Sequence, residues 1–169
     1  MVKGKCLRLM KKAIFLDRDG IINRERDDYT YRLEDFEILP DVIEILLYFQ
    51  KKNYLLIIIS NQSGVAKNIY SQGDVEILHS YLLTIFEKNL IHLTEIYYCT
   101  HHPEKGKCLC RKPNSLMVEK AVARFNIDAS KSYFIGDKQR DIDAGEKAGV
   151  KGLFIESNHS LKEVLSIVI

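Results

Sequence analysis

The sequence lacks the features that would assign the protein to a membrane, a secretory route or a nucleic acid. No apolar run approaches the ~18 residues that a membrane-spanning helix requires, so we expect no membrane partner. The apolar residues of the basic start, 1–12, are interrupted by Arg8 and do not form a signal-peptide core. The formal net charge is only +2, which gives no reason to expect a nucleic-acid partner. We therefore expect a cytoplasmic protein.

The chain also lacks internal repeats, low-complexity stretches and any linker that would divide it. A length of 169 residues is enough to bury one sizeable core without disulfides or metals. The sequence thus predicts a single domain over 1–169, which we expect to be a monomer. The first predicted strand begins after 10–12, so 1–9 is expected to be a loose extension.

Cysteine is scarce, and its placement is informative. Of four cysteines, Cys99, Cys108 and Cys110 fall close together and Cys6 lies far away. In a reducing compartment, clustering of this kind favours a metal site over disulfides. Cys6 is interpreted as an ordinary free thiol that behaves as a small apolar residue.

Short apolar runs alternate with segments of helical periodicity. The pattern predicts strands over 13–16, 54–59, 95–99, 132–135 and 152–155, and helices over 41–50, 74–89, 115–125 and 141–148. Strands of nearly continuous apolar residues separated by helices are typical of a parallel sheet covered on both faces. The predicted fold class is therefore α/β, with a Rossmann-like parallel sheet. Right-handed crossovers would place all carboxyl ends of the strands at one edge, where ligands of such folds bind.

Polar side chains follow four of these strands. They are Asp17 and Asp19 after the first, Ser60 and Asn61 after the second, Lys112 in the loop after the third, and Asp137 and Asp141 after the fourth. Their convergence at one edge predicts a catalytic site.

The acidic residues suit phosphoryl transfer. Asp17 can attack phosphorus and form an aspartyl-phosphate, which divides hydrolysis into two easier steps. An anion that attacks a phosphate needs a cation held by oxygen ligands, so we expect magnesium bound by Asp17, Asp19, Asp137 and Asp141, the last through water. Asp19 can protonate the leaving alcohol and then accept a proton from water.

The remaining polar residues suit the phosphoryl group itself. Ser60 and Asn61 can donate hydrogen bonds to its oxygens, and Lys112 can balance the charge that spreads over them.

A second predicted site is a zinc-binding loop over 99–110. Cys99, His101, Cys108 and Cys110 supply three thiolates and one imidazole, which is a closed tetrahedral set. His102 is an alternative to His101, but alternation along an extended chain favours His101, on the same side as Cys99. Because Cys110 directly precedes the Arg-Lys pair at 111–112, zinc would fix where those cations stand.

Four segments resemble, in order and spacing, the motifs of the haloacid dehalogenase superfamily: Asp-Arg-Asp-Gly at 17–20, Ser-Asn-Gln-Ser-Gly at 60–64, Arg-Lys-Pro at 111–113 and Gly-Asp-Lys-Gln-Arg-Asp at 136–141. The resemblance implies a magnesium-dependent phosphatase with an aspartate nucleophile. No room exists between the motifs for a separate cap domain, so a capless, open site is expected.

The cysteine–histidine loop that leads into Arg-Lys-Pro resembles one branch of that superfamily, which holds the D-glycero-D-manno-heptose 1,7-bisphosphate 7-phosphatases and the histidinol-phosphate phosphatases. Segments 61–66 and 99–103 favour the heptose enzymes. The resemblance implies a sugar phosphate whose 7-phosphate is removed during synthesis of nucleotide-activated heptose for lipopolysaccharide. The resemblance also implies that the substrate is contacted by Asn23, Glu25, Tyr29, Arg111 and Lys138, in addition to Asn61. The alternatives are a histidinol-phosphate phosphatase and, in another class, a catalytically inactive, zinc-stabilised interaction module.

Overall fold

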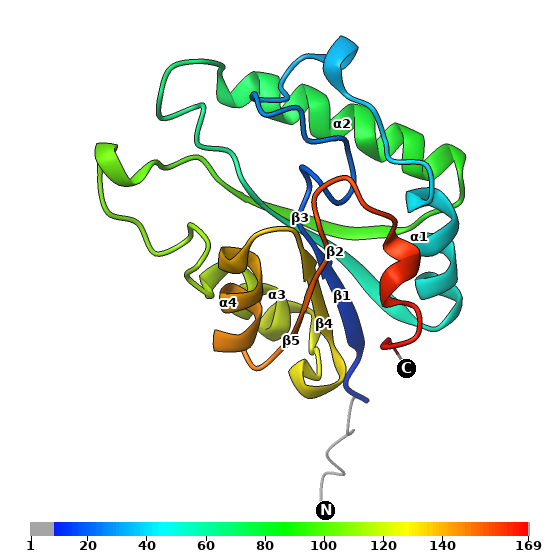
Figure 1. Cartoon of the computed structure of the whole chain (residues 1–169). Coiled ribbons are helices and arrows are strands. Elements are labelled where there is room, and N and C mark those ends of the chain that lie inside the picture. Colours follow the sequence, from blue (N-terminus) through cyan, green and yellow to red (C-terminus); the bar gives the residue numbers. More distant parts are fainter. Residues whose placement is uncertain (1–8, 169) are drawn as a thin grey trace, which may run out of the picture.

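Five apolar segments of the chain form one parallel β-sheet (Figure 1). The computed structural model describes residues 9–168, in which the strands are β1 (Lys12–Leu16), β2 (Tyr54–Asn61), β3 (Leu93–Cys99), β4 (Tyr133–Gly136) and β5 (Lys151–Phe154). Their order across the sheet is β3-β2-β1-β4-β5, and every neighbouring pair is parallel. All five predicted strands are confirmed. Most of the expected extension, 1–8, which includes Cys6, lies outside the described residues, and Leu9 is 92% exposed.

Both faces of the sheet are covered because side chains alternate along its central strand. Ile14 and Leu16 point into one core, together with α1 (Val42–Lys51) and α2 (Gln72–Lys88). Ala13 and Phe15 point into the other, together with α3 (Leu116–Phe125) and α4 (Gln139–Lys147). Figure 1 shows the two helix pairs on opposite sides of the sheet. Burying a Leu or Phe side chain in this way stabilises the fold by ~1.5–3 kcal/mol each. The predicted α/β fold class is confirmed.

Two helix ends have identifiable capping chemistry, the start of α2 and the end of α3. Ser71 Oγ accepts a hydrogen bond from the Asp74 N–H, and Asp74 accepts one from the Ser71 N–H at 2.7 Å, which forms a capping box before α2. This box starts α2 two residues before the predicted boundary at 74. At the end of α3, Asn126 adopts a left-handed conformation with φ of 54°, as a helix C-terminus often requires.

Within 9–168 the structure also contains four short 3-10 helices that were not expected from the sequence: η1 (Leu33–Asp35), η2 (Pro103–Lys105), η3 (Ala129–Lys131) and η4 (Leu161–Val164). The last of them buries Leu161 and Val164 in the core that contains α1. One turn is too short to establish a helical period in the sequence.

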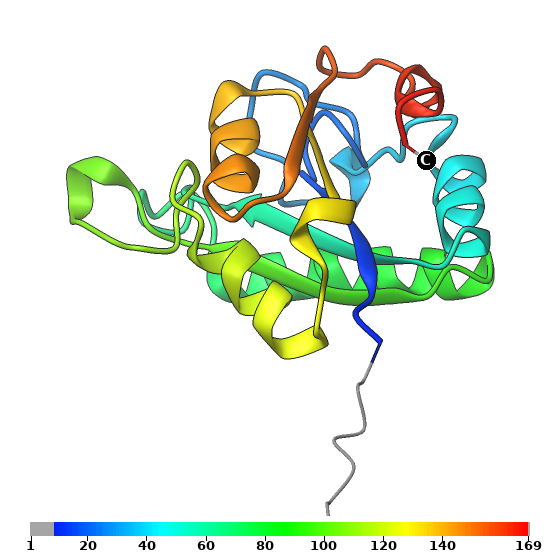
Figure 2. The same ribbon diagram turned by 90° about the horizontal axis from the view of Figure 1, so that it is seen from below.

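The connections that leave the carboxyl edge of the sheet carry no cap. Segments 17–41, 62–71 and 100–115 contain, among the described residues, no helix longer than a three-residue 3-10 turn. The loop after β3 extends away from the sheet (Figure 2). In the part of the chain that the structure describes, no helix combines the length and apolar character needed to cross a bilayer.

Candidate active site

Three buried carboxylates meet at the carboxyl edge of the sheet. Asp17 follows β1, Asp137 follows β4, and Asp141 lies in the first turn of α4. Each offers an oxygen atom, and these oxygens lie within 4.8 Å of one another. A Cβ atom on Gly136 would lie 2.3 Å from Asp141 Cβ, so glycine at this position allows α4 to bring Asp141 against β4. The structure therefore brings together three of the four residues that were predicted to bind magnesium.

Lys112 places an ammonium group inside this cluster. Its Nζ lies 2.8 Å from Asp17 Oδ1 and 2.8 Å from Asp141 Oδ1, and it donates to the Ile59 carbonyl at 2.7 Å. Burial lowers the pKa of Lys112, but attraction to Asp17 and Asp141 outweighs it and leaves the pKa above its usual value. The side chain therefore stays charged.

The cluster carries more negative charge than Lys112 can balance. Burial raises the pKa of Asp17 to about 7, and repulsion from Asp141 adds to this rise, although Lys112 opposes it. The second ammonium group, Lys138 Nζ at 3.0 Å from Asp137 Oδ2, is 45% exposed and is therefore screened by water. A set of buried carboxylate oxygens with this imbalance fits a hard cation such as Mg²⁺.

Asp19 has a different environment. Its Oδ1 accepts from Arg18 Nη2 at 3.0 Å and from Asn23 Nδ2 at 3.0 Å, while its Oδ2 accepts from Gln62 Nε2 at 3.0 Å. Burial raises the pKa of Asp19, but the charge of Arg18 and these hydrogen bonds outweigh it and hold the pKa below its usual value. Asn23, which was predicted to contact substrate, is fully buried, and its Nδ2 hydrogen bond joins it to Asp19.

Ser60 and Asn61 occupy the end of β2. Ser60 is fully buried and its Oγ accepts from Gln62 Nε2 at 2.7 Å. The Asn61 side chain pairs with the peptide groups of Lys112: Nδ2 donates to the Lys112 carbonyl and Oδ1 accepts from the Lys112 N–H, both at 3.1 Å. Asn61 thus holds the loop that carries Lys112 against the sheet.

A cavity of about 270 Å³ opens above these groups. Of the residues predicted to act in the site, seven line it: Asp17, Asp19, Glu25, Tyr29, Asn61, Arg111 and Asp137. Ser60, Lys112 and Asp141 lie in the layer beneath, and the described contacts of Lys138 are with Asp137 and Asp141.

The cavity wall also contains residues that sequence reasoning missed. Arg18 and Gln62 lie inside the quoted motifs at 17–20 and 60–64, so their positions could have drawn attention to them. Arg140 lies inside the motif at 136–141 in the same way, whereas Tyr70 follows no pattern that indicated a site. His102, left as the alternative zinc ligand, lines the cavity instead.

The segment that carries Glu25 and Tyr29 is anchored from two sides. The Glu25 N–H donates to Asn158 Oδ1 at 2.7 Å, and the Tyr29 ring meets the Tyr70 ring edge-on at 5.7 Å. Burial, with a smaller contribution from the charge of Asp19, raises the pKa of Glu25.

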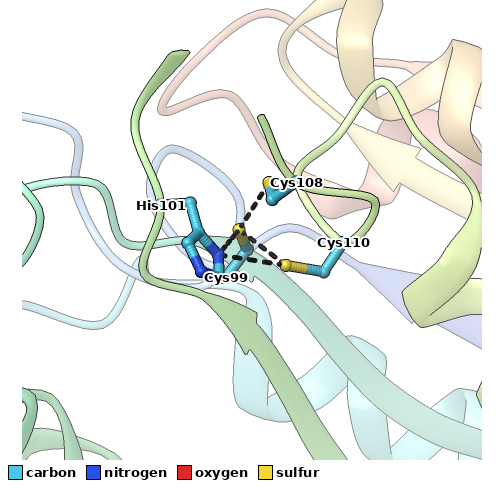
Figure 3. Close-up of side chains that lie close together, drawn as sticks. All are labelled: Cys99, His101, Cys108 and Cys110. Atoms are coloured by element: carbon cyan, nitrogen blue, oxygen red, sulfur yellow. Dashed lines mark hydrogen bonds between the residues drawn. The ribbon is translucent and has the colours of Figure 1, made fainter. Parts of the chain in front are cut away.

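The four predicted zinc ligands converge at the base of the loop after β3 (Figure 3). Cys99 Sγ lies 3.4 Å from His101 Nδ1, 3.7 Å from Cys108 Sγ and 3.0 Å from Cys110 Sγ. Zinc–sulfur and zinc–nitrogen bonds of ~2.3 and ~2.0 Å separate tetrahedral ligands by ~3.5–3.8 Å. Two of these contacts are close to that range and the third is shorter, so the donor set and its spacing fit a zinc ion.

Comparison with known proteins places this geometry in context. A family model described as HAD-hydrolase-like matches residues 109–166. A D-glycero-alpha-D-manno-heptose-1,7-bisphosphate 7-phosphatase from Campylobacter jejuni is 43% identical over 90% of this chain and 86% of its own length. A D-glycero-beta-D-manno-heptose-1,7-bisphosphate 7-phosphatase from Haemophilus ducreyi is 40% identical over 83% of this chain and 80% of its own.

Among solved structures, a D,D-heptose 1,7-bisphosphate phosphatase from B. bronchiseptica, complexed with magnesium and phosphate, superimposes with a TM-score of 0.81. It covers 92% of this chain and 86% of its own at 24% identity, which shows the shared fold.

Proposed function

The chain belongs to the heptose-1,7-bisphosphate 7-phosphatases of the HAD-like hydrolases, and we propose that it hydrolyses the 7-phosphate of D-glycero-D-manno-heptose 1,7-bisphosphate. The observation that carries the proposal is Lys112, buried between Asp17 and Asp141 at 2.8 Å from each, beneath a cavity of about 270 Å³. A buried ammonium beside a nucleophilic carboxylate suits a phosphoryl group.

The reaction has two steps. Asp17 attacks phosphorus, the bond between phosphorus and the C7 oxygen breaks, and a proton from Asp19 leaves with the alcohol. Water then attacks the aspartyl-phosphate, Asp19 accepts its proton, and phosphate is released. Lys112 and the Ser60 hydroxyl offset the charge on the phosphoryl oxygens in both steps.

Magnesium would be held by Asp17, Asp137 and Asp141, with Asp19 beside them, and would offset the negative charge that nucleophile and phosphate bring together. Zinc would be held by Cys99, His101, Cys108 and Cys110. Its proposed task is mechanical, because Cys110 is bonded directly to Arg111 and fixes the start of the Arg111-Lys112 pair.

Two alternatives are less well supported. The relatives are named heptose bisphosphate phosphatases, which supports that branch over histidinol-phosphate phosphatase. Against an inactive interaction module stands the full set of Asp17, Asp19, Ser60, Lys112 and Asp137, which lie at the carboxyl edge of the sheet.

The test compares substrates on the purified protein with magnesium. We expect kcat/KM for heptose 1,7-bisphosphate, assayed as both anomers, to exceed that for histidinol phosphate by at least ~10-fold, or ~1.4 kcal/mol of differential transition-state binding. A higher kcat/KM for histidinol phosphate would overturn the proposed substrate and leave the phosphatase chemistry in place.

A further inference from the structure

One amide side chain links the proposed acid to the proposed phosphoryl-binding hydroxyl. Gln62 is 2% exposed, and its Nε2 donates to Asp19 Oδ2 at 3.0 Å and to Ser60 Oγ at 2.7 Å. Its Oε1 accepts from the Tyr70 hydroxyl at 2.9 Å. Both N–H groups and the oxygen of this amide are thus used inside the site.

The orientation of the amide follows from what each partner can do. An ionised carboxylate only accepts hydrogen bonds, so the NH₂ group of Gln62 must face Asp19 and its oxygen must face Tyr70. Burial raises the pKa of Tyr70 to about 12, so the hydroxyl keeps its proton and donates it. Rotating the amide by half a turn would set oxygen against carboxylate, and the Tyr70 hydroxyl opposes this rotation.

This orientation decides which atoms are left for chemistry. Asp19 Oδ1 already receives hydrogen bonds from Arg18 and Asn23, whereas Oδ2 receives one, from Gln62. Oδ2 is therefore the atom with room to give or take a proton. Because Ser60 Oγ accepts from Gln62, its own proton remains available for an acceptor such as a phosphoryl oxygen.

Tyr70 is itself held firmly. Its ring stacks on Tyr31 at 5.1 Å and meets Tyr29 edge-on. A Cβ on Gly64 would lie 2.0 Å from Tyr70 Cε1, so only glycine leaves space for the ring in this position. The hydroxyl that orients Gln62 thus comes from a fixed ring that is 7% exposed.

We propose that Tyr70 is a positioning residue which, through the Gln62 amide, aims Asp19 Oδ2 at the leaving oxygen and the Ser60 hydroxyl at the phosphoryl group. The proposal rests on the proposed function, since these two groups act together only in phosphate ester hydrolysis.

A double-mutant cycle tests it on the full chain. The variants are Tyr70→Phe, Gln62→Met and their combination, with kcat/KM measured on heptose 1,7-bisphosphate and on p-nitrophenyl phosphate. Loss of one neutral hydrogen bond should lower kcat/KM for the sugar phosphate ~5-fold in Tyr70→Phe. The aryl ester, whose leaving group needs no proton, should lose less than half its rate, because it depends on the Ser60 contact alone and not on the Asp19 proton. Gln62→Met should cost more, and Tyr70→Phe should then add nothing, because its effect passes through Gln62.

Tyr31→Phe, on the ring that stacks against Tyr70, is the matched control and should leave kcat/KM unchanged. The proposal would be overturned if the losses in kcat/KM of the two single variants multiplied in the double variant. It would also be overturned by equal losses on both esters, or by no loss in Tyr70→Phe. If the unmodified protein hydrolyses histidinol phosphate instead of the heptose, the proposed substrate is wrong, and the same cycle is read on histidinol phosphate.

Discussion

At the scale of single residues, two aspartates two positions apart are driven to opposite protonation behaviour. Burial raises the pKa of Asp17 to about 7, while Arg18, Asn23 and Gln62 outweigh burial and depress the pKa of Asp19. Divergent environments of this kind separate the roles of two carboxylates in one site. A nucleophile must be ionised, so the raised pKa of Asp17 fits the need for a bound cation to keep it charged, whereas the depressed pKa of Asp19 keeps that carboxylate ready to accept a proton from water.

Replacing the nucleophile should abolish turnover. Asp17→Asn keeps the shape of the side chain, but a neutral amide neither attacks phosphorus nor binds magnesium well. We expect kcat to fall at least ~10⁴-fold, measured on p-nitrophenyl phosphate with the thermal midpoint as a check on folding. Asp143→Asn, on the exposed side of α4 beside Gln139, is the control. Retained activity in a pure preparation would remove Asp17 from the mechanism.

His79 should make the fold sensitive to acid. Burial and the nearby charge of Arg18 lower the pKa of His79 from 6.5 to about 3, and its Nε2 lies 3.4 Å from Arg18 Nη1. Between these two pKa values His79 is protonated in the unfolded chain but neutral in the folded protein. The free energy of unfolding therefore carries the full contribution of His79 above pH 6.5. That contribution falls as the pH decreases towards 3, by ~2 kcal/mol at pH 5.

Urea unfolding at pH 7.5 and pH 5 measures this effect. His79→Gln should lose less stability between the two pH values than the unmodified protein, whereas the exposed His92→Gln should behave like the unmodified protein. An identical pH dependence in His79→Gln would contradict the assignment.

At the scale of elements, the loop after β3 couples a metal site to catalysis. Because Cys110 adjoins Arg111 and Lys112, loss of one zinc ligand should release the loop that carries both cations. We expect about one zinc per unmodified chain, from the ligand count. Cys110→Ala should contain less than half of that zinc, melt at a lower temperature and lose at least ~10-fold in kcat through misplacement of Lys112.

Elemental analysis and thermal melting are the readouts for the loop. Lys107→Ala changes an exposed residue of the same loop and should keep its zinc. Active, well-folded protein without zinc would rule out this role.

Long elements could be predicted from the sequence, and short ones could not. The strands and the four α-helices were recognisable because their apolar periodicity extends over several residues. The start of α2 was placed too late because Ser71 and Asp74 act through a cap and not through an apolar pattern. Single 3-10 turns such as Leu161–Val164 were missed because they are stabilised by packing against a core formed by distant segments, which leaves no periodic pattern in the sequence.

At the scale of the whole molecule, the sheet explains which site residues could be predicted. Asp17, Lys112 and Asp141 were identified because parallel strands deliver their ends to one edge. Tyr70 could not be, since it lies outside the four motifs and only the folded chain brings its hydroxyl against Gln62. Asn23, which was predicted to contact the substrate, is fully buried and donates to Asp19 Oδ1.

Because no cap domain covers the site, selectivity for the substrate must come from residues at the rim of the cavity. Arg111 and Arg140 are arginines of the cavity wall, and a guanidinium fork suits a second phosphate. Arg111→Ala should lower kcat/KM for heptose 1,7-bisphosphate ~10-fold and that for p-nitrophenyl phosphate less than ~2-fold. Arg124→Ala, at an exposed arginine paired with Glu95, should change neither. Equal losses on both esters would assign Arg111 to the phosphate that is cleaved.

The pairing between Asn61 and Lys112 has a consequence for how the molecule tolerates change. A primary amide carries the same donor and acceptor as a peptide group, so the Asn61 side chain substitutes for one rung of backbone pairing between segments 51 positions apart. Aspartate lacks the donor and leucine lacks both groups, while glutamine is one methylene longer. Side-chain mimicry of the backbone thus makes asparagine irreplaceable at this position on grounds of pairing alone, whatever substrate the site accepts.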